Sequence, residues 1–195
     1  MKQCMDADNL HHRLKKVIGQ VQAIDRMVDE DVPCEDILAQ INAPKPRDDT
    51  GKSGGNPFIE MAKSDDFAKF HILWKGKYSF IVMNKFPYNC GHLLVLPLRE
   101  IGDIELLEGD EKTEFFDSII RAKRILREAL NPDAFNVGFN LGAKAGAGIP
   151  QHLHCHVVPR WDGDTNFMPV ISDTRVLPQS LDTLWVKLKK FADKI

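Results

Sequence analysis

The sequence predicts an α+β fold: a mostly antiparallel sheet with one long helix and a C-terminal helix, preceded by an N-terminal helical segment. Short strand-like segments lie on both sides of a single long amphipathic pattern over residues 110–130. A second helical pattern, 181–191, closes the chain, and a stretch rich in Pro, Gly and charged residues, 44–57, separates the first 43 residues from the rest. Strands grouped around one helix, without regular alternation of strand and helix, are typical of α+β domains.

Residues 9–30 form the first helical pattern, because apolar side chains recur there every three or four residues and so share one face. Asp31-Val32-Pro33 ends this helix, and Pro33 suits the first turn of a second helix that stops at Pro44. We therefore predict three parts: a helical segment over 1–43, a linker over 44–57 and a folded domain over 58–195.

The domain from residue 58 contains short apolar runs bounded by turn residues, which is the pattern of β-strands. The long helix ends at Asn131-Pro132-Asp133, and a Gly/Ala-rich loop follows at 142–148. The predicted strands are 71–74, 78–83, 92–96, 135–140 and 153–158.

Composition limits the function classes. The chain has 195 residues, 43% hydrophobic and 28% charged, as in soluble globular proteins. A net charge of −2 provides no overall basic surface, so nucleic acid is not an expected partner. No apolar run approaches the ~18 residues of a membrane span, and the N-terminus lacks the apolar core of a signal peptide. The four Cys are scattered without a C-x-x-C pair, which favours reduced thiols and a cytoplasmic location.

Three histidines at alternate positions mark the last predicted strand. Side chains alternate along a strand, so His152, His154 and His156 share one face, about 7 Å apart in succession. The residues that alternate with them point to the opposite face, into a core: Leu153, Cys155 and Val157. Three imidazoles in a row indicate a function rather than packing.

Two kinds of chemistry suit such a row. Neutral His is a common ligand of Zn²⁺ or Cu²⁺, although three along one strand diverge awkwardly for a tetrahedron. Alternatively, a neutral imidazole attacks a phosphoryl centre and forms a covalent N–P intermediate, which water or another acceptor then cleaves. The flanking imidazoles would then bind and orient the phosphoryl group.

The string His152-Leu153-His154-Cys155-His156-Val157-Val158 resembles the signature of the histidine triad family, and the resemblance covers roughly residues 56–190. Residues 84–97 resemble the nucleotide-binding strand–loop–strand of that family. Residues 136–142, with Ala145-Gly146, resemble its phosphate-contacting strand and loop. The resemblance implies a nucleotide or dinucleoside polyphosphate substrate and a homodimer.

The resemblance also implies a role for each matching residue. His154, the middle histidine, would be the nucleophile, and His152 and His156 would bind the phosphate and steady the scissile bridge. The other implied contacts are Asn140, Gly146, Gly148 and Gln151 on the phosphate side, Asn84 at a ribose hydroxyl, and His92 buried behind the triad.

The block from Gly146 to Trp161, followed by Gly163-Asp164-x-Asn166-Phe167, is similar to the diadenosine tetraphosphate (Ap4A) phosphorylase branch of the family. This similarity favours inorganic phosphate over water as the acceptor of the nucleotidyl group. A phosphate acceptor needs a second anion site, for which Lys144, Arg160 and Asn166 are the candidates. The alternatives within the family are a nucleoside phosphoramidase and a general nucleotide hydrolase.

The chain departs from many bacterial relatives at residues 56–59, Asn-Pro-Phe-Ile, where those relatives carry a zinc-binding C-x-x-C. We therefore expect no structural zinc and no metal ligands. No cofactor is expected to be obligatory, although a divalent cation can accompany the nucleotide.

Residues 10–43 resemble the first helix and a half of metal-sensing repressors related to the copper-sensing repressor. Cys34 falls on the sensing cysteine of that family, but the later His and Cys of its second helix are missing here. The segment is expected to be a helical hairpin that associates or docks. A metal-responsive DNA-binding regulator is the alternative from another function class.

Overall fold

The chain divides into two compact units, Met1–Lys52 and Ser53–Ile195. The computed structural model describes residues 55–164 and 179–195 of the second unit, and residues 15, 18–19, 21–23, 25–30 and 32–33 of the first. The described residues between 15 and 29 are helical, within the predicted helix 9–30. The second predicted helix beyond Pro33, and the predicted linker as far as residue 54, lie outside the described residues.

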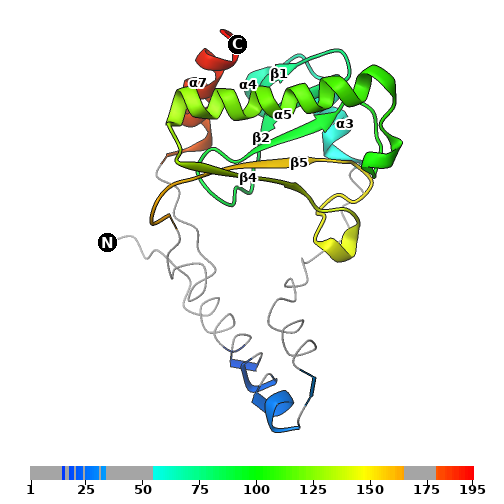
Figure 1. The fold of residues 1–195 in the computed structure, drawn as a ribbon, viewed down its shortest axis with the longest axis vertical. Coiled ribbons are helices and arrows are strands. Elements are labelled where there is room, and N and C mark those ends of the chain that lie inside the picture. The colour runs from blue at the N-terminus through cyan, green and yellow to red at the C-terminus, as the bar shows by residue number, and fades with distance from the viewer. Residues whose placement is uncertain are drawn as a thin grey trace. The chain divides into compact units, whose positions relative to one another are not determined.

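A five-stranded antiparallel sheet forms the frame of the described part of the second unit (Figure 1). The strands follow the order β1-β2-β3-β5-β4, so the last strand is inserted between β3 and β4. Their bounds are β1 Ile72–Lys75, β2 Ser79–Met83, β3 Leu93–Pro97, β4 Ala134–Phe139 and β5 Cys155–Arg160. Each lies within two residues of its predicted position, and the α+β prediction is confirmed.

Two helices cover one face of the sheet. Helix α5, Gly109–Leu130, packs on β2, β3 and β5, and α7, Leu181–Ala192, packs beside it (Figure 1). A capping box between Glu108 and Glu111 starts α5, and Asn131 ends it in the left-handed conformation with φ of 46°. The apolar face of α5 meets the alternating inward residues of the sheet, including Cys155 and Val157 of β5.

Two short helices, α3 (Pro57–Lys63) and α4 (Phe67–Phe70), pack on the other face of the sheet. Asn56 caps α3 and Pro57 occupies its first turn, where a missing N–H costs nothing. Phe58 is 9% exposed and joins a second apolar cluster with residues of β1, β2 and β3. The histidine row faces this side. None of the described helices is long and apolar enough to cross a membrane.

Candidate active site

Only the last of the three histidines lies within β5; His152 and His154 precede the strand. The prediction of a strand that begins at residue 153 is wrong for residues 153 and 154. The N–H of Leu153 donates to the carbonyl of Ile101 instead of joining a ladder. The alternation of side chains still continues, because Leu153 packs in the α5 core while the histidines face α3.

His152 is fully buried, and both of its ring nitrogens are engaged. Its Nε2 lies 2.9 Å from the carbonyl oxygen of Pro97, at the end of β3. Because a carbonyl only accepts, Nε2 carries the proton and Nδ1 must accept. The side-chain amide of Asn56 donates to Nδ1 at 2.9 Å. Burial lowers the pKa of His152 below its ordinary value, so the ring is neutral at pH 7.

His154 is 7% exposed and is oriented by its own chain. Its Nδ1 lies 2.8 Å from the backbone carbonyl of His152, to which it must donate. The ring also packs against Phe58, with centroids 5.6 Å apart. In the neutral ring, Nε2 therefore carries a lone pair, and no hydrogen bond within the described residues engages it. His154 has the geometry of a nucleophile.

His156 is oriented by a hydrogen bond from His92. The backbone N–H of Tyr88 donates to Nδ1 of His92 at 3.0 Å, so the proton of neutral His92 is on Nε2. This Nε2 lies 2.9 Å from Nδ1 of His156, which must accept. The proton of His156 is then on its own Nε2. The structure thus places His92, 1% exposed, behind the triad, where the resemblance implied it.

The Nε2–H of His156 is a buried donor without a partner among the described residues. Burial, with a smaller contribution from neighbouring His154, lowers the pKa of His156 to about 4, so the ring stays neutral. An orphaned buried donor costs about 1–3 kcal/mol unless a ligand satisfies it. The rings of His154 and His156 are 5.0 Å apart. The triad therefore offers one free lone pair beside one free N–H.

The sheet face is open at Gly138, beside His156. Gly138 of β4 pairs directly with His156, so their side-chain positions lie on the same face. A Cβ placed on Gly138 would meet no atom within 4 Å. The ladder ends one residue later at Phe139, and half-buried Asn140 follows directly after β4. The space beside Gly138 is therefore open next to His156.

The Gly/Ala-rich loop follows Asn140 and is exposed over most of its length. Gly142 and Gly146 have φ of 83° and 88°, values that glycine adopts at little cost. Lys144 and Gly148 lie exposed in this loop, and Gln151 lies exposed just before the triad. Three of the predicted phosphate-side residues, Gly146, Gly148 and Gln151, are thus solvent-accessible between β4 and the triad.

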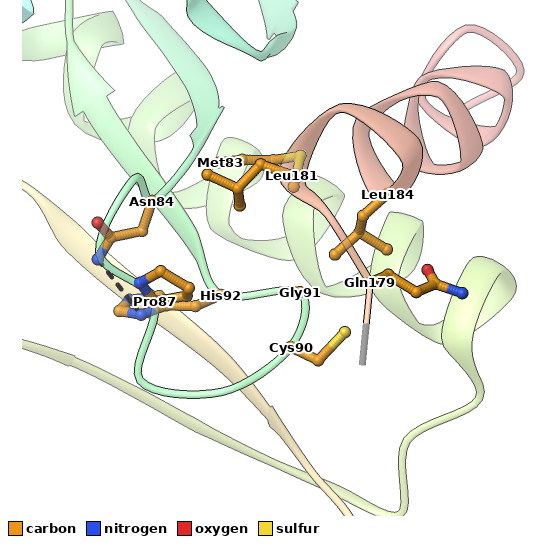
Figure 2. Close-up of a pocket in the computed structure, with 9 residues that line it drawn as sticks. All are labelled: Met83, Asn84, Pro87, Cys90, Gly91, His92, Gln179, Leu181 and Leu184. Carbon is orange, nitrogen blue, oxygen red and sulfur yellow. Dashed lines mark hydrogen bonds between the residues drawn. The ribbon is translucent and has the colours of Figure 1, made fainter. Parts of the chain in front are cut away.

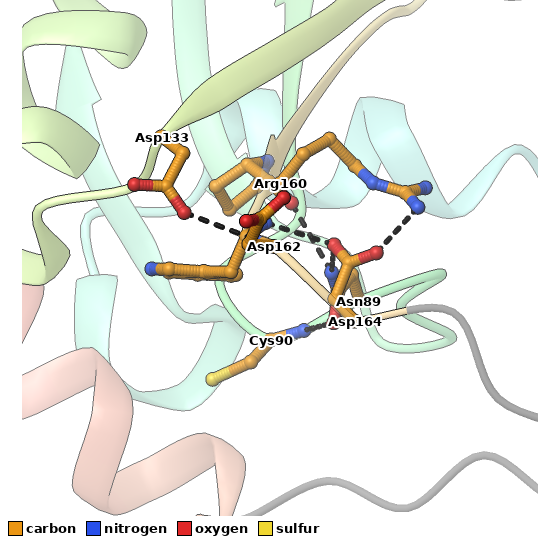
Figure 3. A network of polar contacts seen from close by, with 8 residues as sticks. Asn89, Cys90, Asp133, Arg160, Asp162 and Asp164 are labelled. Carbon is orange, nitrogen blue, oxygen red and sulfur yellow. Dashed lines mark hydrogen bonds and ion pairs between the residues drawn. The ribbon is translucent and has the colours of Figure 1, made fainter.

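Arg160 lies at the end of β5 and forms an ion pair with Asp164 (Figure 3). The same carboxylate accepts the N–H of Trp161 and the amide of Asn89, at 3.0 Å and 2.7 Å. Asn89 also donates to the carbonyl of Pro159. This network ties the loop between β2 and β3 to the end of β5. Asn166, the third predicted anion ligand, lies outside the described residues.

Asn84 begins the loop between β2 and β3, and its side chain is used within that loop. Its Oδ1 accepts the N–H of Phe86 at 2.9 Å, and its Nδ2 lies 3.3 Å from Nδ1 of His92 (Figure 2). The loop and the start of α7 line a small pocket with Asn84 at its edge, formed by Met83, Asn84, Pro87, Cys90, Gly91, His92, Gln179, Leu181 and Leu184.

A zinc ion does not fit the residues at the start of the domain. Asn56 and Ile59 stand where the resembling bacterial proteins carry cysteines. Both ring nitrogens of neighbouring His152 are already in hydrogen bonds, so the lone pair on its Nδ1 is not free for a metal. Across the described ranges, no three His, Cys, Asp or Glu side chains are grouped as metal ligands.

Three residues at the site were not predicted as functional from the sequence. Asn56 contacts His152, Phe58 packs on two of the triad rings, and Tyr88 stacks on His156 with centroids 5.4 Å apart. Asn56-Pro57 has the sequence signal of a helix start, an N-cap followed by proline. No local signal indicates the contacts of Phe58 and Tyr88, because their partners are about 70–100 residues away along the chain.

Comparisons with known proteins agree with this geometry. The family model described as HIT domain matches residues 68–163, and that of the metal-sensitive transcriptional repressors matches residues 6–46. An AP-4-A phosphorylase of Mycobacterium tuberculosis is 40% identical over 140 residues, which cover 71% of each chain. An asymmetrical bis(5'-nucleosyl)-tetraphosphatase of Schizosaccharomyces pombe is 31% identical over 53% of this chain and 59% of its own.

A solved structure shows the same fold. The zinc-bound histidine triad family protein of Mycobacterium smegmatis aligns with a TM-score of 0.58 and 20% identity, over 72% of this chain and 94% of its own. Both resemblances inferred from the sequence are confirmed by these matches. The chain belongs to the histidine triad family.

Proposed function

We propose that this protein cleaves dinucleoside polyphosphates through a covalent nucleotidyl-histidine intermediate. The observation that carries the proposal is the hydrogen-bonding of the triad, in which His154 Nε2 has the free lone pair. The names of the relatives, a phosphorylase and a tetraphosphatase, support the substrate class.

In the proposed reaction, Nε2 of His154 attacks the phosphorus next to one nucleoside. The N–P bond forms as the bond to the bridging oxygen breaks, and the remaining polyphosphate leaves with the second nucleoside. The Nε2–H of His156 stands beside this centre to donate to a phosphoryl or bridging oxygen. The accessible backbone of the glycine loop and Asn140 supply further donors, and Asn84 is assigned to the ribose.

An acceptor oxygen then attacks phosphorus and breaks the N–P bond. We assign inorganic phosphate as this acceptor, supported by the similarity to the AP-4-A phosphorylase. Lys144 is the exposed cation in the glycine loop, whereas Arg160 already pairs with Asp164. Phosphate binding by Arg160 therefore requires it to share or exchange this partner.

The test is product analysis with diadenosine tetraphosphate during a phosphate titration, starting from phosphate-free buffer. Phosphorolysis yields ADP and ATP, and its rate rises with phosphate. AMP and ATP at a constant rate would assign the enzyme to the hydrolases instead. Cleavage only of nucleoside phosphoramidates would overturn the dinucleotide substrate. The same assay with EDTA and with Mg²⁺ tests the expectation that no divalent cation is obligatory.

We also propose a homodimer with a cytoplasmic location. Strand β4 is an edge of the described sheet, and Val137 on it is 48% exposed. On α5, Phe116 and Ile120, one turn apart, are 66% and 42% exposed. Apolar side chains at an unpaired edge favour self-association. Sedimentation equilibrium of the full chain tests the dimer, and a monomer at micromolar concentration would contradict it.

The match to metal-sensitive repressors favours a second candidate function for the N-terminal unit, metal-responsive regulation. The expected role remains association or docking, since the sequence lacks the later ligands of the sensor. Copper analysis of the purified protein separates the two: a stoichiometric metal supports sensing, and co-purified nucleotide supports the enzyme.

A further inference from the structure

Asn56 lies before the segment matched by the HIT family model, and every polar atom of its side chain is used. Its Oδ1 accepts the N–H of Phe58 at 3.0 Å, which caps α3. Its Nδ2 donates to Glu100 Oε1 at 3.1 Å and to His152 Nδ1 at 2.9 Å. A primary amide has two N–H donors, so both are engaged. The amide cannot be reversed, because its NH₂ group would then face the N–H of Phe58.

This fixed amide and the carbonyl of Pro97 together select the tautomer of His152. The ring is held from two sides, by the donor of Asn56 at Nδ1 and by the carbonyl of Pro97 at Nε2. The ring edge of His152 meets Phe58 of the helix that Asn56 caps, with centroids 5.4 Å apart and planes at 77°. The orientation of His152 and the start of α3 are therefore set by the same side chain.

The backbone of His152 passes this constraint to the nucleophile. Its carbonyl accepts the Nδ1–H of His154 at 2.8 Å, and this bond leaves the lone pair on Nε2 of His154. This carbonyl belongs to the peptide whose N–H, on Leu153, donates to the carbonyl of Ile101, so the backbone is anchored here as well. A displacement of the His152 ring that followed the loss of its Nδ1 partner would act on this peptide through the Cα that they share, and would shift the direction of the His154 lone pair.

We infer that Asn56 is a positioning residue for the reaction: it holds His152 neutral with its proton on Nε2, and so fixes the carbonyl that orients the His154 nucleophile. Only the expected effect on kcat rests on the proposed function. The tautomer of His152 is a property of the resting protein and is measurable without a substrate.

The decisive variant is Asn56→Asp, which changes one group in an isosteric side chain. Aspartate caps a helix as well as asparagine does, so α3 keeps its N-terminal hydrogen bond. It has no N–H to donate at neutral pH, and it adds a carboxylate beside Nδ1 of His152 and Glu100. His152 then gains a proton on Nδ1, and its pKa rises. The matched control is Asp66→Asn, which changes the cap of α4 in the opposite sense, away from the triad.

Two measurements on the full-length protein test the inference. Nitrogen-15 NMR of the histidine rings should show unprotonated Nδ1 and protonated Nε2 for His152 in the native protein and in Asp66→Asn, and protonated Nδ1 in Asn56→Asp. In diadenosine tetraphosphate cleavage, kcat should fall by about 10–100-fold with KM changed by less than about 3-fold, as for other residues that orient a reacting group through a neighbour. The acidic limb of the kcat–pH profile should move to higher pH.

Different results are expected if Asn56 only caps α3 and has no effect on His152. Asn56→Asp would then keep the native His152 signals and a kcat within about 2-fold of the native enzyme, and this outcome overturns the inference. Asn56→Ser keeps the cap but does not reach His152, so native kcat in this variant also overturns it. If the native protein cleaves no nucleotide, the proposed function fails, while the NMR result still decides whether Asn56 sets the tautomer.

Discussion

Gly138→Val tests whether the open face between β4 and the triad is the path of the substrate. Gly138 lies opposite His156, and a Cβ there meets no atom within 4 Å. The Cβ of a valine therefore enters empty space beside His156. Its backbone is ordinary strand, since Gly138 is not among the residues with positive φ.

The substitution should separate stability from activity. Replacing a strand glycine restricts the unfolded chain, which stabilises by about 0.4–1 kcal/mol, and valine also favours strands. A gain of about 1 kcal/mol raises Tm by about 2–4 °C in a chain of this size. The branched side chain meanwhile fills the space that a phosphoryl group needs next to Nε2 of His154. A displacement of about 1 Å costs on the order of 100-fold in rate, which corresponds to about 2.7 kcal/mol of activation free energy.

The assay is kcat/KM for diadenosine tetraphosphate together with thermal unfolding of the same sample. The matched control is Asn136→Val, which adds valine to the same face of β4 two residues away, opposite Val158. We expect this control to retain kcat/KM within about 3-fold, because it lies farther from the nucleophile. If Gly138→Val keeps the native kcat/KM, the substrate does not pass over Gly138. If its Tm falls, the side chain at position 138 meets neighbouring atoms and the space beside Gly138 is not open.

Further predictions concern the nucleophile, the N-terminal unit and pH. His154→Asn should abolish turnover and keep nucleotide binding by calorimetry; more than about 1% residual kcat would exclude His154 as the nucleophile. Deletion of residues 1–52 should leave a folded, active enzyme with native melting temperature, since the remaining residues form a compact unit; an insoluble or inactive product would contradict this. Urea unfolding should show stability falling as the pH decreases from 6.5 to 4, because the unfolded chain binds a proton at His156 that the native ring, with its pKa of about 4, does not. The loss approaches about 3 kcal/mol, and a flat profile would contradict the neutral, buried ring.

The strands and the two long helices could be predicted because their patterns are local. Helix α5 has 22 residues, a clear apolar face and the stop signal Asn131-Pro132, and its predicted bounds are within a residue of those observed. The short helices α3 and α4, with 7 and 4 residues, were not predicted. Helices of this length are marginal on their own, and packing on the sheet stabilises them. Phe58 contributes this packing from a segment whose sequence is otherwise unremarkable.

The site shows the same division between local and long-range information. His154 finds its partner two residues away, in the backbone carbonyl of His152, so the contact that orients the nucleophile is local in the sequence. His152 and His156 depend on Pro97, Asn56 and His92, which are 55, 96 and 64 residues away. Those partners fix which nitrogen of each outer ring is protonated, and the spacing of histidines contains no information about that. The resemblance to the histidine triad family could therefore imply the middle histidine as the nucleophile, whereas the assignment of a donor to His156 and of a ring held at both nitrogens to His152 needs the fold. The same reasoning explains why Asn56 was overlooked: from the sequence it is only a position where the resemblance implied a cysteine, and its partner His152 lies 96 residues away.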